Sequence, residues 1–361
     1  MPLAPHDDRP MARPPAPATN QALEGPTILY LSPLAALIYP LSLTAFNAAV
    51  MTFDAGHQPA LSVAVAALSL ALSFGLSTST VFSSLHLAQR LAPTPIETRA
   101  KYAAFFAVCA PTLFVFVSVL NYMAGNPVPD LAVWLMLWAA VLIYIHSGSS
   151  TAVIKGSLSA RTALRVAHGI SAVTIILLFL CLHITNHLAG LIGPDAHASF
   201  MELARRVYRA RMIEPILVVL MLFQIGSGLF LAFGHSRAPM DGFRAFQNIS
   251  GLYLAFYILG HMDSVFVYAR WFLRIDSNWA FATGAPVGLI MGSWNVRLIP
   301  HYALGIFFLF AHLASGLRLV LMAHGWRKDV ADRVMIGCSI AGSVVALLVI
   351  LAMCGMRIRF E

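Results

Sequence analysis

The chain has 361 residues, of which 59% are hydrophobic and only 11% are charged. Soluble proteins usually carry about 25% charged residues, so this composition excludes a soluble globular enzyme. Apolar runs of about 20 residues, the length that crosses a bilayer as a helix, cover most of the chain. They are too long and too continuous for the strands of an outer-membrane barrel. We therefore expect an all-α, polytopic transmembrane helix bundle with eight or nine spans.

The charge balance and the cysteines exclude several further classes. The 23 Lys and Arg residues exceed the 15 Asp and Glu residues, but they lie in the connections between apolar runs rather than in one block. This pattern indicates membrane topology and not nucleic-acid binding. The four cysteines form no close pair, which argues against a disulfide framework or a zinc site. The sequence also has no CxxCH, P-loop, HExxH or GxSxG motif.

In chain order, residues 1–26 are rich in Pro and Ala and are expected to form a flexible tail rather than a signal peptide. Three further regions follow: a four-helix transmembrane region at 27–155, a bundle at 156–324 and a C-terminal transmembrane helix within 325–361. Pro, Gly and charged residues delimit nine candidate spans, at 27–50, 60–89, 101–124, 130–150, 163–190, 211–234, 245–270, 298–323 and 333–356.

Two connections are longer than the others. Residues 191–210 and the adjoining Arg211 carry four arginines, and this connection is expected to form an amphipathic helix at the membrane interface, with its charges facing headgroups or another span. Residues 271–297 are rich in Trp, as interfacial segments often are. The distribution of Lys and Arg favours a cytoplasmic N-terminus and an outer C-terminus. We therefore expect a multi-pass protein of the cell inner membrane.

Thirteen histidines are present, and eight fall within or at the ends of the expected spans: His86, His146, His168, His183, His187, His261, His301 and His312. An imidazole in hydrocarbon is costly and usually has a partner. One interpretation makes these rings interhelical hydrogen-bonding or interfacial groups. The other makes two of them haem iron ligands, which requires imidazoles from two helices at the same membrane depth.

Depth can be compared between spans because a helix rises about 1.5 Å per residue. His183 and His261 each lie several residues before the outer end of their span. We therefore expect the two rings to face each other and to ligate one haem iron. His312 lies near the middle of 298–323 and is matched in depth by Gln224. An amide is a poor haem ligand, so this second candidate cofactor level is incomplete.

His187 follows His183 by four residues and shares its helix face. This spacing suits a dinuclear metal site, or a haem ligand with a neighbouring residue that contacts a propionate, and we assign the propionate or a capping role to His187. His168 and His301 lie near span ends and are expected to be interfacial.

Two acidic residues fall within the five spans that begin at residue 163 or later. Glu214 precedes Pro215 at a helix start, where a carboxylate is favoured by the helix dipole, so we expect a structural role. Asp263 points to a different face from His261 and is a candidate for orienting another helix or relaying protons.

Four segments then occur in a notable order: RVAHGISAVTIILLFLCLHITNHLAGLIGPDAHASFM, LVVLMLFQIGSGLFL, NISGLYLAFYILGHMDSV and IPHYALGIFFLFAHLASGLRLV. Together, from about 165 to 324, they resemble the haem b membrane anchor of succinate dehydrogenases and fumarate reductases, in its five-helix, two-haem form. The resemblance implies a haem between His183 and His261. It also implies a second pair in which Gln224 stands where the family has a histidine opposite His312. Four spans precede this region, where the family has none.

The same region resembles bacterial membrane proteins of no assigned activity that share its HxxNH, Gln and SGLYLAF pattern. From the resemblance and the depth match we expect a b-type cytochrome-like protein that holds one haem b. It would pass electrons between a membrane quinone and a partner protein, as the membrane subunit of a quinone-linked oxidoreductase. The alternative is a cofactor-free membrane module, such as an assembly factor, a sensor or a transporter, that keeps the anchor-like fold.

Overall fold

A computed structural model describes residues 27–91, 93–148, 162–236 and 239–358. The expected N-terminal tail and the expected boundary near residue 155 lie outside these ranges. Every regular element in the described ranges is a helix, so the prediction of an all-α bundle is confirmed. Seven of its helices are long and apolar enough to cross a membrane, and an eighth span is counted if one bent pair is a single span. The chain is therefore a multi-pass membrane protein.

The long helices are α1 (Thr27–Asp54), α2 (Pro59–Ala88), α9 (Ile213–His235), α10 (Gly242–Met262), α13 (Leu298–Ala323) and α14 (Lys328–Met353), together with the continuous span Thr162–Ala189. That span consists of α6 (Thr162–Ile175), the π-helical segment η2 (Ile176–Leu180) and α7 (Cys181–Ala189). A second π-helical segment, η3 (Asp263–Leu273), continues α10. The shorter elements are α5 (Asp130–His146), α8 (Pro194–Tyr208), α11 (Trp279–Thr283), α12 (Gly288–Met291) and the 3₁₀ turn η4 (Asn295–Arg297).

The expected single span at 101–124 consists instead of two helices, α3 (Pro95–Val108) and α4 (Ala110–Met123), which meet at an angle of 73°. The bend lies next to Pro111, in the first turn of α4. Proline lacks a backbone N–H, and its ring clashes with the carbonyl four residues earlier, so a straight helix cannot continue through this point. A capping box between Thr94 and Glu97 starts α3 earlier than the hydrophobicity indicates.

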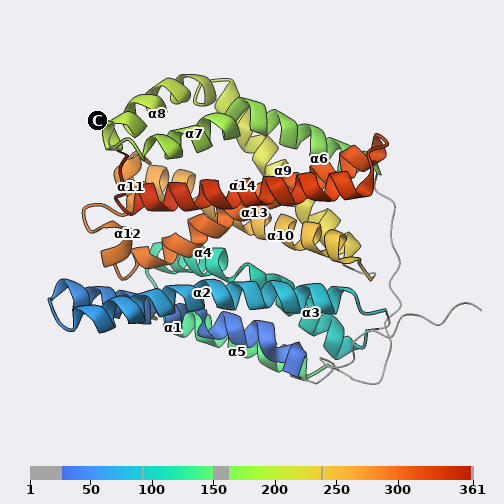
Figure 1. The fold of residues 1–361 in the computed structure, drawn as a ribbon, viewed down its shortest axis with the longest axis horizontal. Coiled ribbons are helices and arrows are strands. Elements are labelled where there is room, and N and C mark those ends of the chain that lie inside the picture. Colours follow the sequence, from blue (N-terminus) through green and yellow to red (C-terminus); the bar gives the residue numbers. More distant parts are fainter. Residues whose placement is uncertain (1–26, 92, 149–161, 237–238, 359–361) are drawn as a thin grey trace, which may run out of the picture.

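The bundle has three parts in projection (Figure 1). α1, α2, α3 and α5 lie along one side, α6, α7 and α8 along the other, and α10, α13 and α14 between them. α10 is the central helix, because it packs against α2, α3, α4, α9 and α13. Exposed apolar side chains such as Leu68 on α2 and Leu177 on η2 face outward, where a membrane supplies lipid contacts.

The N-terminal helices and the C-terminal half share one core. Buried residues from both, including Tyr39, Trp134 and Val349, belong to a single apolar cluster. A partly buried ion pair adds to the joint, since Arg297 lies 2.8 Å from Asp130 and also donates to the Ser118 hydroxyl. This joint fixes the start of α13, which carries two of the histidines considered next.

Candidate functional site

A cavity of about 930 Å³ lies between α7, α8, α10, η3 and α13. Its lining is mainly apolar and aromatic, and it includes five histidines from four elements: His183, His187, His197, His261 and His301. The volume is at the upper end of the range typical of small-molecule and cofactor sites. The region in which the sequence predicted His183 and His261 to meet is therefore a cavity lined by imidazoles.

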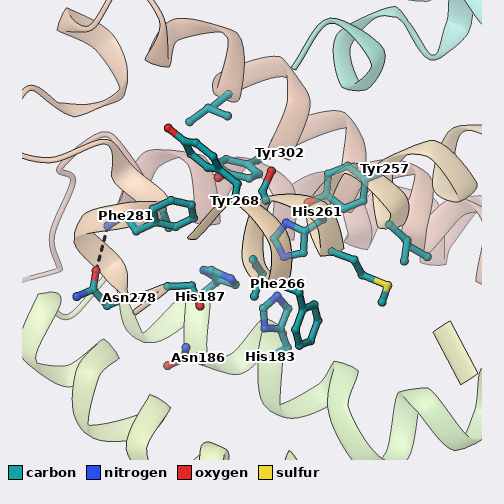
Figure 2. A pocket seen from close by; sticks show the side chains of 18 of the residues that line it. His183, Asn186, His187, Tyr257, His261, Phe266, Tyr268, Asn278, Phe281 and Tyr302 are labelled. Carbon is teal, nitrogen blue, oxygen red and sulfur yellow. Dashed lines mark hydrogen bonds between the residues drawn. The ribbon is translucent and has the colours of Figure 1, made fainter. Parts of the chain in front are cut away.

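His183 on α7 and His261 on α10 face each other across this cavity (Figure 2). Their ring centres are 6.0 Å apart and the ring planes are inclined by 68°. Neither ring forms a hydrogen bond with any other described residue, so their nitrogens are free to bind a ligand. Sequence depth alone placed these two residues together, and the structure brings them together.

Both histidines lie next to π-helical segments. η2 ends three residues before His183, and η3 begins two residues after His261. A π turn adds a residue to the helical repeat, which changes the face that the following residues present, and such turns are frequent at functional sites. Aromatic neighbours then hold the rings: Phe179 stacks on His183 at 4.7 Å, and Tyr257 is nearly parallel to His261 at 5.8 Å.

His187 lies beside the pair, with its ring centre 4.7 Å from that of His183. Its Nδ1 is buried and has no hydrogen-bond partner. The structure thus places His187 at the cavity wall, adjacent to the expected ligands. Its assignment to a haem propionate stays a prediction.

Two further histidines in the cavity were missed by sequence reasoning. His301 was expected at the membrane interface, but it is buried, lines the cavity and lies 4.8 Å from the Tyr257 ring. The Tyr257 ring fits beside His301 because residue 305 is a glycine. A Cβ at Gly305 would come within 2.2 Å of that ring. The sequence shows that His301 follows Pro300 at the start of a helix. This position does not indicate whether the ring points to the membrane surface or into the bundle.

His197 lies on α8, the expected amphipathic helix at 191–210. It accepts a hydrogen bond from the Asn186 amide at 3.1 Å and stacks on Trp279 at 4.5 Å. Burial first, and the nearby Arg205 guanidinium second, lower the pKa of His197 to about 4. The ring is therefore neutral near pH 7. Because His197 and Arg205 line the cavity, α8 forms one of its walls instead of lying free on the membrane surface.

The second expected level is occupied by hydrogen bonds within the protein. Gln224 lines the inner part of the cavity and donates to the His168 carbonyl at 2.7 Å and to the Ser171 hydroxyl at 2.6 Å. His312 is not among the lining residues, and its Nδ1 lies 3.1 Å from the Ser250 hydroxyl. The structure therefore does not bring Gln224 and His312 together around a common space.

The two acidic residues singled out from the sequence have different surroundings. Glu214 forms an ion pair with Arg270 at 2.6 Å, which ties the start of α9 to the end of η3. The Asp263 carboxylate has one buried oxygen without a partner, but the residue does not line the cavity. These contacts agree with a structural role for Glu214.

The two facing imidazoles fit the ligand set of a haem iron. Among the described residues, no group of three His, Cys, Asp or Glu side chains that could hold a metal ion was found. A haem iron needs only two protein ligands. With metal–imidazole bonds of about 2 Å, the two ring centres would be separated by about 6 Å, and the observed separation is 6.0 Å.

The comparisons with known proteins leave the family open. No protein-family model, no curated protein and no solved structure matches the chain. The likeness to the succinate dehydrogenase anchor therefore stays a prediction from the quoted segments, and the function is argued from the cavity.

Proposed function

We propose that the chain is a membrane b-type cytochrome that holds one haem b between His183 and His261. The observation that carries this proposal is the pair of facing imidazoles, 6.0 Å apart, free of other hydrogen bonds and set in a cavity of about 930 Å³. An unpartnered imidazole inside a membrane protein is costly, and iron ligation recovers that cost.

A bound haem b supplies one-electron transfer. The chain provides the two imidazoles, the flat aromatic neighbours that fix their orientation, and an apolar wall that keeps water away. Phe179 and Tyr257 each cover one ligand ring, so the rings cannot turn freely. A rigid, dry site is what a haem needs to change charge with little rearrangement of its surroundings.

Electrons would pass between a membrane quinone and a partner protein. The sequence has no dinucleotide-binding GxGxxG motif opening a helix, and its four cysteines show no cluster spacing. We therefore assign the second redox centre of the proposed pathway to a partner protein. A quinone dissolves in the lipid that surrounds the exposed apolar helix faces. This arrangement corresponds to the membrane subunit of a quinone-linked oxidoreductase in the cell inner membrane.

The test is a dithionite-reduced minus oxidised absorption spectrum of the purified protein, with haem quantified per chain. We expect a b-type spectrum at about one haem per chain, and loss of the Soret band in His183→Ala and His261→Ala. His324→Ala is the matched control, because His324 ends α13 at an exposed position. Circular dichroism and elution volume of each variant separate ligand loss from misfolding. Absence of haem from wild-type protein made with ample haem supply would refute the proposal.

A cofactor-free membrane module is the second candidate. The observation that favours it is the inner level, where His168, Gln224 and His312 all form hydrogen bonds that hold helices together. If His183 and His261 served packing in the same way, their replacement would lower thermal stability without changing any absorption band.

A further inference from the structure

Three arginines line the cavity on the side of α8. Arg205 is in the last turn of α8, Arg209 follows that helix, and Arg270 lies in η3. We call these three residues the arginine cluster. Their location brings cationic groups to one side of a cavity that is otherwise mainly apolar.

The contacts of the arginine cluster leave donors unused. Arg205 donates to the Ser277 carbonyl at 3.0 Å, and no acidic side chain among the described residues pairs with it. The nearest acid to Arg209 is Asp276, at 3.6 Å, and this carboxylate is 70% exposed. The Nε atoms of Arg205, Arg209 and Arg270 are all buried without a hydrogen-bond partner.

The three guanidinium groups also repel one another. The pKa of Arg209 lies below its ordinary value because of burial first, and because of the neighbouring Arg205 and Arg270 second. Three cations face two carboxylates, those of Glu214 and Asp276, so one positive charge is left over. A cluster of like charges beside a low-dielectric cavity is destabilising until an anion neutralises it.

Lipid headgroups outside the protein do not explain this arrangement. Arg206 and Arg211, which are neighbours in the sequence, are exposed and free to reach headgroups. Arg205 and Arg209 instead turn toward the cavity. The segment 205–211 therefore has two arginines that are exposed and two that line the cavity. The two that line the cavity need an anionic partner inside it.

We propose that the arginine cluster is an anion subsite of the cavity, which binds the acidic oxygens of the ligand whose body lies among the apolar side chains. The identity of that ligand rests on the proposed function. For haem b the acidic groups are its two propionates, and they would point toward α8, close to His187. For an amphipathic lipid the acidic group is its phosphate. Arginine is suited to both, since its planar fork binds carboxylate and phosphate oxygens in pairs.

The test uses full-length protein made in haem-deficient cells, titrated with haem b and with haem b dimethyl ester, which keeps the iron but lacks the free carboxylates. Wild type is expected to bind haem b at least tenfold more tightly than the ester, since a charged hydrogen bond changes affinity by about 10- to 100-fold. In R205Q/R209Q the two compounds are expected to bind equally, at the affinity of the ester for wild type. R206Q/R211Q is the matched control and should keep the wild-type preference.

The outcomes separate this inference from the proposed function. Equal binding of haem b and its ester by wild type, or an unchanged preference in R205Q/R209Q, refutes the anion subsite while leaving the haem intact. If wild type binds neither compound, the haem proposal fails and phospholipid phosphorus per purified chain decides the inference. About one more phosphorus in wild type than in R205Q/R209Q supports a phosphate in the subsite, and equal phosphorus overturns it.

Discussion

The ion pair between Arg297 and Asp130 offers a sharp test of how the two halves of the bundle are joined. The atoms are 2.8 Å apart, and the side chains are only 11% and 20% exposed. Arg297 also donates to the Ser118 hydroxyl and lies over the Phe114 ring at 4.5 Å. Asp130→Asn keeps the shape of the side chain and removes its charge, which leaves the guanidinium without a counter-ion.

Breaking a fully buried pair by removing one partner costs about 3–5 kcal/mol. Arg297 keeps its hydroxyl and ring contacts, and Asp130 is partly accessible, so we expect the lower value of about 2–3 kcal/mol for Asp130→Asn. SDS-induced unfolding in mixed micelles, followed by circular dichroism, measures the loss. Asp329→Asn is the control, because its partners Arg327 and Arg333 are 81% and 75% exposed and such pairs contribute less than about 1 kcal/mol.

A double-mutant cycle with Arg297→Met isolates the pair itself. For close charge pairs that are well desolvated, the coupling energy is expected to be at least about 1.5 kcal/mol. A coupling energy below about 0.5 kcal/mol, or a loss in Asp130→Asn no larger than that in Asp329→Asn, would show that the pair does not join the two halves.

Three further predictions concern close contacts around the cavity. Gly190→Ala places a Cβ within 2.2 Å of the Trp279 ring, so we expect Trp279 to leave His197 with a red shift in fluorescence, whereas Gly169→Ala, which has open space, should change nothing. Gly251→Ala brings a Cβ within 2.8 Å of the His312 ring, so we expect the free energy of unfolding to fall by about 1–3 kcal/mol with unchanged haem per chain. Loss of haem would put His312 in the cofactor site. Gly316→Ala, which has open space, is the control. Gln224→Met removes two hydrogen bonds and should cost about 1 kcal/mol with haem retained, so a loss of haem would make Gln224 a cofactor contact.

The sequence predicts the helical spans well because hydrophobicity over about 20 residues is a strong signal in a membrane protein. It also brings His183 and His261 together, because helix rise converts residue number into depth. It does not predict the bend at Cys109, since Pro111 lies inside an otherwise continuous apolar run. Nor does it predict η2 and η3, because no residue type marks a π turn.

The directions of side chains near the membrane surface were also beyond the sequence. His301 and Arg205 both lie at helix ends, where a ring or a guanidinium can turn either toward headgroups or inward. The choice depends on packing between segments far apart in the chain. For His301 the deciding contact is Tyr257 on α10, and for Arg205 it is the Ser277 carbonyl, 72 residues later in the sequence.

The histidines of this bundle differ in what their nitrogens already contact. The Nδ1 atom of His312 lies within hydrogen-bonding distance of the Ser250 hydroxyl and the Gln247 carbonyl, and that of His168 lies 2.8 Å from the Ser227 hydroxyl, so one nitrogen of each ring has a partner. His183 and His261 have ring neighbours but no hydrogen bond to any described residue, and they face a cavity. An imidazole nitrogen in that position raises the free energy of the folded protein unless something binds it. For this reason we place the proposed haem at His183 and His261 rather than at His312.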